Sequence, residues 1–109
     1  MLDALFGSQS ERQVLLFMQN YDEGYGADIA RTFDRPLFPV RKRLQKMEEN
    51  GWLVSRLVGK TRVYSWNPRN PRVKPLREFL QTVLDYLPED EIKKYFRARR
   101  RPRRFDKSL

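Results

Sequence analysis

Apolar and polar residues recur with helical spacing in the first third of the chain. Ser8 and Glu11 have the spacing of a capping box, in which two side chains bond free backbone N–H groups at a helix start. The run "RQVLLFMQNY" follows, so we predict a first helix from about residue 9 to 21. After the expected loop "DEGYG", a short helix is predicted in "ADIARTF", with three apolar residues on one side: Ile29, Ala30 and Phe33.

A third helix is predicted from about residue 37 to 50, because one narrow apolar stripe recurs there at i, i+4 and i+7. The stripe consists of Val40, Leu44 and Met47. Gly51 follows, and glycine is typical of the position just beyond a helix end. The face opposite the stripe is polar and basic, and it carries Phe38, Lys42 and Gln45, with Arg41 and Lys46 beside them.

The segment "WLVSRLVGKTRVYSWNP" predicts two short strands, at about residues 53–58 and 62–67, joined at Gly59 and Lys60. A two-stranded hairpin alone is marginally stable in water, so this one must pack against the helices. The residues expected on its inward side are Val54, Tyr64 and Trp66. A proline-rich link, "NPRNPRVKP", comes next.

A wide apolar stripe then recurs at helical spacing in "KPLREFLQTVLDYL", up to Pro88: Leu76, Phe79, Leu80, Val83, Leu84 and Leu87. This stripe is either part of the core alone or a dimer interface. In the second case it is shared with the first helix and with an apolar arm that contains Leu2, Leu5 and Phe6. A last helix is predicted in "PEDEIKKYFRARRR", with Pro88 in its first turn, and Tyr95 and Phe96 would extend the interface.

Charge is segregated along the chain, whose net charge at neutral pH is +9. Residues 1–34 hold two basic and six acidic side chains, whereas residues 35–77 hold twelve basic and two acidic ones. Residues 78–96 hold two basic and five acidic side chains, and residues 97–109 hold seven and one. This segregation favours a surface that binds a polyanion. The plainer interpretation is a soluble domain that is merely basic.

Composition excludes several kinds of chemistry. The 109 residues suit one small domain and include no cysteine and no histidine, which excludes disulfides, thiol nucleophiles and zinc sites of the Cys/His type. No catalytic constellation stands out, so we predict no enzyme activity and no cofactor. No apolar run is long enough to span a bilayer, and no secretion signal is recognisable, so we expect a cytoplasmic protein.

The predicted order is three helices, a basic hairpin and a further helix, in which the second and third helices form a helix-turn-helix. The segments "LFGSQSERQVLLFM", "YGADIARTF", "VRKRLQKMEENGWLVSRLVGKTRVYSWNP" and "VKPLREFL" resemble ArsR-like winged helix-turn-helix transcriptional regulators over roughly residues 5 to 87. The resemblance implies a mainly α fold with a small β-hairpin. We therefore divide the chain into a winged helix-turn-helix DNA-binding domain at 1–73 and helices for dimerisation at 74–96. Residues 97–109 form a basic tail whose composition predicts disorder.

The resemblance implies a homodimer that binds double-stranded DNA. The recognition helix at 37–50 would enter the major groove, and the wing at 58–62 would meet the backbone or minor groove. The implied contacts are Phe38, Arg41, Lys42, Gln45, Lys46, Arg56, Lys60, Thr61 and Arg62.

Two features depart from the family. Its metal sensors use Cys or His, so we expect no metal effector here, and "PLFP" is bulky where the recognition helix often begins with small polar residues.

Each implied contact has a second interpretation. Arg41, Lys42 and Gln45 would read bases or contact phosphates only, and Thr61 would touch DNA or only serve the turn. The tail "RARRRPRR" would be a DNA-contacting arm or a nonspecific tether to anions, RNA included. Its residues expected on DNA are Arg99, Arg100 and Arg101.

Three functions are compatible with these patterns. The first is a sequence-specific DNA-binding transcriptional regulator. The second is a nucleic-acid-binding module without sequence preference, architectural or RNA-binding. The third is a winged-helix module for protein contacts. The Arg, Lys and Gln side chains on the third helix favour the first two, and the way affinity falls with salt on specific and random duplexes would separate these.

Overall fold

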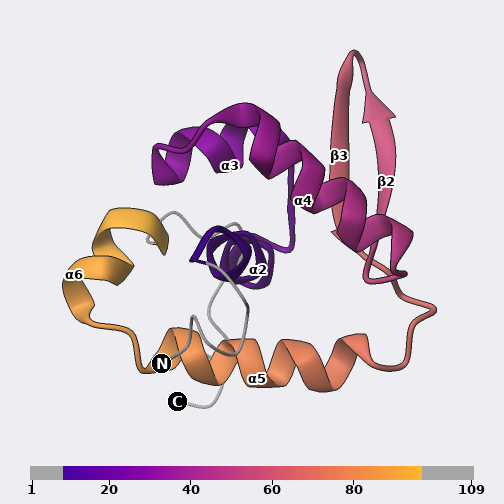
Figure 1. Ribbon diagram of the computed structural model, residues 1–109. Coiled ribbons are helices and arrows are strands. Elements are labelled where there is room, and N and C mark those ends of the chain that lie inside the picture. Colours follow the sequence, from indigo (N-terminus) through magenta and orange to yellow (C-terminus); the bar gives the residue numbers. More distant parts are fainter. Residues whose placement is uncertain (1–8, 97–109) are drawn as a thin grey trace.

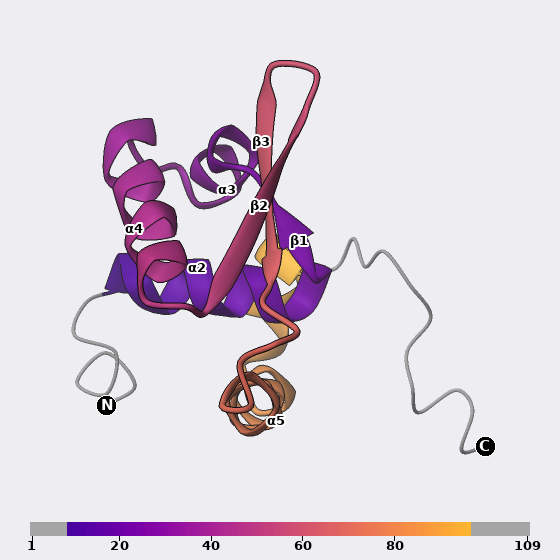
Figure 2. The same ribbon diagram turned by 90° about the vertical axis from the view of Figure 1, so that its right-hand side faces the viewer.

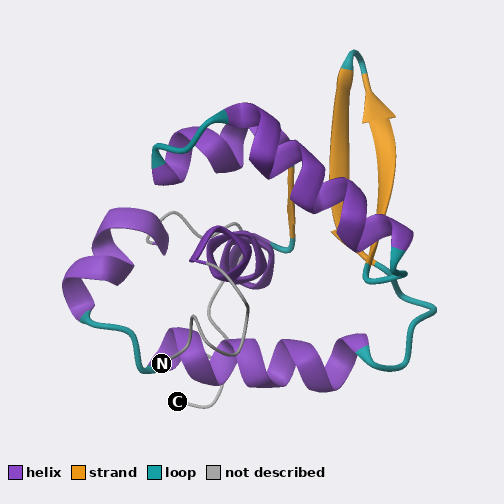
Figure 3. Cartoon of the chain, viewed as in Figure 1, coloured by secondary structure: helices purple, strands orange, loops and turns teal. Residues whose placement is uncertain are grey.

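The computed structural model describes residues 9–96 (Figures 1 and 3). In chain order the elements are α2 (Gln9–Tyr21), β1 (Glu23–Gly24), α3 (Gly26–Phe33), α4 (Leu37–Glu49), β2 (Leu53–Val58), β3 (Thr61–Trp66), α5 (Val73–Asp85), α6 (Glu89–Glu91) and the π-helical segment η1 (Ile92–Phe96). The site predictions that lie outside the described residues are those for Leu2, Leu5, Phe6, Arg99, Arg100 and Arg101.

Helix α2 runs through the centre of the molecule, between α3 and α4 on one side and α5 on the other (Figure 1). Its residues 12–21 are all buried, polar ones included. Because buried polar groups need hydrogen-bond partners, these side chains connect α2 to distant segments. The Gln13 side-chain oxygen accepts a hydrogen bond from Arg35 at 2.7 Å, and the Asn20 amide donates one to the Phe96 carbonyl at 3.0 Å.

The predicted helices α2, α3 and α4 are confirmed to within a residue or two at each end. The stripe of Val40, Leu44 and Met47 is buried, as expected. Gly51, just beyond α4, has a φ of 85°, which is the left-handed conformation that glycine adopts without strain. No helix among residues 9–96 combines the length and the apolar character that a membrane crossing requires.

The sheet has three strands where we predicted two. Its order is β1-β3-β2, with Glu23 opposite Ser65, so the segment expected to be only a loop contributes an edge strand (Figure 2). A strand of two residues has no alternating pattern of its own, and only its pairing with β3 defines it. This extra pairing ties the base of the hairpin to the end of α2.

The hairpin register corrects one predicted inward residue. Leu53 lies opposite Trp66 and Ser55 lies opposite Tyr64, and residues directly opposite one another point to the same face. Leu53, Tyr64 and Trp66 are therefore buried, whereas Val54 lies on the other face with 37% of its surface exposed. A one-residue shift exchanges the faces of a strand, which explains the error.

Gly24 of β1 is expected to tolerate no side chain. A Cβ atom added there would lie 2.6 Å from Phe17 and 3.4 Å from Ile29, inside the packed core. Overpacking of this kind costs roughly 1–3 kcal/mol, so Gly24→Ala is expected to lower the free energy of unfolding by about 2 kcal/mol. Urea denaturation would measure this. Gly59→Ala is the control. Gly59 has a positive φ, so an alanine there strains the backbone, but no atom lies within 4 Å of the added Cβ and nothing is crowded.

Helix α5 packs against α2 and belongs to the same core as the other helices. Leu80, Val83 and Leu84, predicted either as core residues or as part of a dimer interface, are buried within the single chain. Leu76 and Leu87 are partly buried against this core, and Phe79 is exposed. Most of the apolar stripe on α5 is therefore core, because α2 of the same chain packs against it.

The C-terminal segment also packs inward. Phe96 is buried, and its ring centroid lies 5.9 Å from that of Phe33. The Tyr95 ring is 4.9 Å from Phe33, and the Tyr95 carbonyl accepts a hydrogen bond from Tyr21 at 2.8 Å. The prediction that Tyr95 and Phe96 extend a dimer interface is therefore wrong for Phe96, whose surface the core already covers. Pro88 precedes α6 as its N-cap residue, one position earlier than predicted.

Candidate nucleic-acid interface

Helix α4 presents the predicted polar and basic face to solvent. Phe38, Arg41, Lys42, Gln45 and Lys46 are all exposed, opposite the buried stripe. Phe38 is the most notable, because 69% of a large apolar side chain is exposed. The Lys42 ammonium lies 5.5 Å from the centre of the Phe38 ring, at the distance of a cation–π contact. The face therefore combines positive charge with one apolar anchor.

The unusual start of α4 is compatible with helix geometry. Pro36 is the N-cap residue, and Pro39 is the third residue of the helix. The first backbone N–H groups of a helix have no partner within it, so a proline in the first turn removes no hydrogen bond. The prolines therefore fix where the helix begins and leave the first turn to display Phe38.

The β2–β3 hairpin extends beyond the helices (Figures 1 and 2). Gly59 at its tip has a φ of 63°, a conformation that suits the two-residue turn it forms with Lys60. Lys60, Thr61 and Arg62 are exposed at the tip, as predicted. Leu57 is also exposed over 63% of its surface, so the hairpin end is apolar as well as basic.

Two polar connections hold the hairpin in place. Arg62 donates a hydrogen bond to the Ser55 hydroxyl at 2.9 Å, and Ser55 donates one to Glu48 of α4 at 2.8 Å. On the other face, Arg56 pairs with Glu23 of β1 at 3.1 Å. Arg56 and Arg62 thus have partners within the chain, and each must share its charge between that partner and any nucleic acid.

Tyr64 lies beside the first of these connections. Its burial raises the pKa of the phenol above its ordinary value, and the nearby Glu48 carboxylate raises that pKa further. A raised pKa keeps the phenol neutral in the folded protein. The stability that this neutral group supports is present below the unfolded pKa and is lost as pH rises through the folded pKa, in the alkaline range.

A groove of about 400 Å³ separates the hairpin from the helices, and we call it the hairpin groove. Arg41 and Gln45 of α4 form one wall, Leu57 and Arg62 form the other, and Gly26 lies where α3 begins. Among the described residues that line it, none is acidic. A smaller groove of about 250 Å³, the outer groove, lies on the other side of α4. Its walls are Pro39, Lys42, Arg43 and Lys46.

Sequence patterns did not point to all of this surface. Tyr25 and Gly26, just before and at the start of α3, line the hairpin groove, and neither was predicted as a contact. Leu57 also lines this groove and was not predicted as a contact. Charge and helical periodicity marked α4 and the wing tip, but neither signal extends to neutral residues at the start of α3.

A comparison with solved structures supports the fold. A mutant of ZitR from Lactococcus lactis, in its apo form, superimposes with a TM-score of 0.51 over 78% of this chain and 73% of that chain, at 15% sequence identity. No protein-family profile and no curated protein sequence matches this chain. The fold is a winged helix-turn-helix. Helices α3 and α4 are its helix-turn-helix, and the hairpin β2–β3 is its wing.

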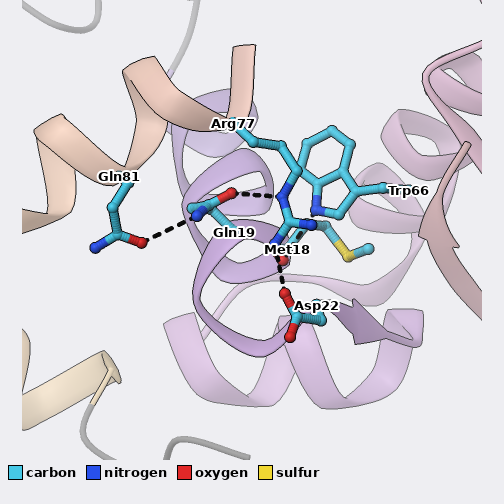
Figure 4. A network of polar contacts seen from close by, with 6 residues as sticks. All are labelled: Met18, Gln19, Asp22, Trp66, Arg77 and Gln81. Carbon is cyan, nitrogen blue, oxygen red and sulfur yellow. Dashed lines mark hydrogen bonds and ion pairs between the residues drawn. The ribbon is translucent and has the colours of Figure 1, made fainter. Parts of the chain in front are cut away.

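The base of the wing is linked to α5 by a polar network (Figure 4). Arg77 of α5 donates a hydrogen bond to Gln19 at 2.7 Å, and it also pairs with Asp22. Its guanidinium carbon lies 5.5 Å from the centre of the Trp66 ring, in the last residue of β3. Arg77 therefore connects α2, α5 and the wing in one place.

The described residues contain no group of three or more His, Cys, Asp or Glu side chains that could hold a metal ion. The Asp22 carboxylate, which pairs with Arg77, and the Glu48 carboxylate, bound by Ser55, serve structural contacts. The surface around α4 and the wing carries cations, an amide and apolar side chains.

Proposed function

We propose that this chain is a DNA-binding transcriptional regulator, with α4 as the recognition helix in the major groove and the wing tip on the DNA backbone or minor groove. The observation that carries this proposal is the exposed face of α4, which stands between two grooves lined by cations. A helix fits the major groove, and cations beside it can meet the phosphates of the two flanking strands. The resemblance to ArsR-like regulators adds support.

The roles of the side chains follow from where they lie on α4. Phe38, Lys42 and Gln45 form the stripe directly opposite the buried one, so they would point at base edges. Gln can pair with adenine, Lys with guanine, and an aromatic ring can contact a thymine methyl group. Lys60 at the wing tip and Lys46 beside the outer groove would contact phosphates, which carry little sequence information.

Replacing Gln45 and Lys60 with alanine should therefore have different consequences. Gln45→Ala is expected to cost roughly 1–3 kcal/mol on the preferred duplex and much less on random duplex, because it removes a base contact. Lys60→Ala should weaken binding to both duplexes alike. The preferred sequence would first be selected from a random duplex library with the purified protein. Fluorescence anisotropy on preferred and random duplexes would then measure both variants.

The matched control is Gln81→Ala on α5, since Gln81 bonds Gln19 on the side of the molecule away from α4. It should leave both affinities unchanged. A wild-type protein that enriches no sequence in the selection, yet still binds duplex, would favour the module without sequence preference. A protein that binds no duplex at low salt would contradict both the sequence-specific regulator and the DNA-binding module without sequence preference.

We also propose that the protein acts as a homodimer, which would read two half-sites about one DNA turn apart. On α5 and just after it, Phe79 is exposed over 42% of its surface, and Leu76 and Leu87 are partly buried, so part of each of these side chains can contribute to an interface. Tyr86, with 84% of its surface exposed, lies just after the helix. The remaining part of the proposed interface, around Leu5, lies outside the described residues.

Phe79→Glu is expected to shift the protein from dimer to monomer without unfolding it. Light scattering should give about twice the monomer mass of 13.2 kDa for the wild type, and the monomer mass for the variant. Glu78→Lys, a charge change at the neighbouring exposed position, is the control and should leave the mass unchanged. A wild type that is monomeric at high protein concentration would contradict the proposal.

A further inference from the structure

The Arg41 side chain passes the start of α3 at Gly26, where a residue with a Cβ atom would crowd it. A Cβ atom placed on Gly26, the first residue of α3, would lie 2.9 Å from Cγ of Arg41 and 3.4 Å from the nearest Leu37 carbon. The first distance is well inside van der Waals contact. Glycine at position 26 thus makes room for the Arg41 stem, although Gly26 has no positive φ that would itself require glycine.

This contact places Arg41 on one particular side of α4. Arg41 lines the hairpin groove, together with Lys60, Thr61 and Arg62 of the wing. Lys42 and Lys46 line the outer groove on the opposite side of the helix. Arg41 is therefore at the edge of the exposed face and next to the wing, whereas Phe38 and Lys42 lie nearer its middle.

The hairpin groove has the chemistry of a site for a phosphodiester strand. Its cations come from α4 and from the wing, and the described residues that line it include no carboxylate to compete for them. Leu57 adds an apolar surface that suits the sugar of a nucleotide, and Thr61 adds a hydroxyl. One DNA strand separates the major groove from the adjacent minor groove, and this groove separates α4 from the wing.

We infer that Gly26 is a positioning residue: because it has no Cβ atom, the Arg41 stem can lie beside α3, and the guanidinium then meets the phosphates of the DNA strand that occupies the hairpin groove. Arg41 then contributes affinity for every duplex and does not select sequence. This inference rests on the proposed function and refines it, because Arg41 was one of the residues proposed to face bases. It also assigns a role in binding to a neutral residue outside the basic segment 35–77.

The experiment is a double-mutant cycle in the full chain, with Gly26→Ala, Arg41→Ala and the combined variant. Binding to the preferred and a random duplex is measured by anisotropy over a range of salt concentrations. For each bound protomer, Arg41→Ala should weaken binding to both duplexes by the same factor, roughly fivefold, and should reduce the log–log salt slope by about 1. Gly26→Ala should act in the same direction more weakly, and should add nothing in the Arg41→Ala background.

Three controls separate this role from a structural one. Thermal unfolding of Gly26→Ala should show no loss of stability, because alanine is the better helix former and the Arg41 stem can move away. Arg41→Lys should keep the salt slope, since a lysine still meets a phosphate but lacks the bidentate geometry for guanine. Arg69→Ala removes a cation from the link beyond the wing and should change neither duplex affinity by more than about twofold.

The outcomes distinguish the inference from the function on which it rests. A loss on Arg41→Ala that is much larger on the preferred duplex than on random duplex would make Arg41 a base reader and overturn the inference alone. Additive effects of Gly26→Ala and Arg41→Ala would also overturn it. A wild-type protein that binds neither duplex would overturn the proposed function and the inference together.

Discussion

Raising the salt concentration from about 50 to about 200 mM should weaken duplex binding by roughly 500-fold for each bound protomer, if about five of its cations meet phosphates. The reason is counterion release, since each neutralised phosphate frees a cation from the DNA and salt opposes this release. The side chains concerned surround α4 and the wing: Arg41, Lys46, Arg56, Lys60 and Arg62. Anisotropy titrations at a series of salt concentrations would give the slope of the logarithm of the binding constant against the logarithm of the salt concentration.

The pairing of Arg56 with Glu23 offers an internal control for this prediction. Glu23→Gln removes the carboxylate that competes for Arg56 but keeps the shape of the side chain. It is expected to strengthen binding modestly and to leave the slope unchanged or slightly steeper. An affinity that is insensitive to salt would mean that phosphate contacts do not drive binding, and would contradict the role proposed for this surface.

Leu80→Ala is expected to lower the free energy of unfolding by about 3 kcal/mol, within the range of roughly 2–5 kcal/mol for large-to-small changes in a core. Leu80 has no exposed surface, and it lies on α5 where this helix packs against α2. The substitution removes buried apolar atoms and leaves a cavity. A small domain has a net stability of only about 5–15 kcal/mol, so urea denaturation should detect the loss easily.

The matched control for Leu80→Ala is Phe79→Ala, at the adjacent position of the same helix. Phe79 is 42% exposed, so its removal should cost clearly less stability in the monomer. A Leu80→Ala variant that kept its stability but lost dimer mass would contradict the packing described for α5. It would return Leu80 to the interface predicted from the sequence.

The local elements of this protein were readable from its sequence. Val40, Leu44 and Met47 predicted the buried side of α4 because a helix places i, i+4 and i+7 on one face, and the structure confirms all three. The exposed positions of Phe38 and Lys42 followed from the same periodicity. Gly51 and Gly59 marked a helix end and a turn, and both have the positive φ that favours glycine there.

The sequence could not show which partner covers each apolar face. The stripe on α5 had the width of an interface, and periodicity cannot tell whether α2 or a second copy buries it. Nor could it place Leu53 inside and Val54 outside, because both are apolar and only the pairing register decides. The edge strand at Glu23 also depends on pairing with residues about forty positions away.

In the candidate interface, too, the sequence predicted some features and only the tertiary structure decided others. Charge and helical periodicity by themselves determined that a basic, amide-bearing face of α4 would be exposed, because these are local properties of a helix. Only the tertiary structure decided that Arg41 lies against Gly26 and faces the wing, while Lys42 and Lys46 face the other side. The physical reason is that the directions of long side chains depend on the neighbouring elements that pack against them, and those neighbours are distant in sequence.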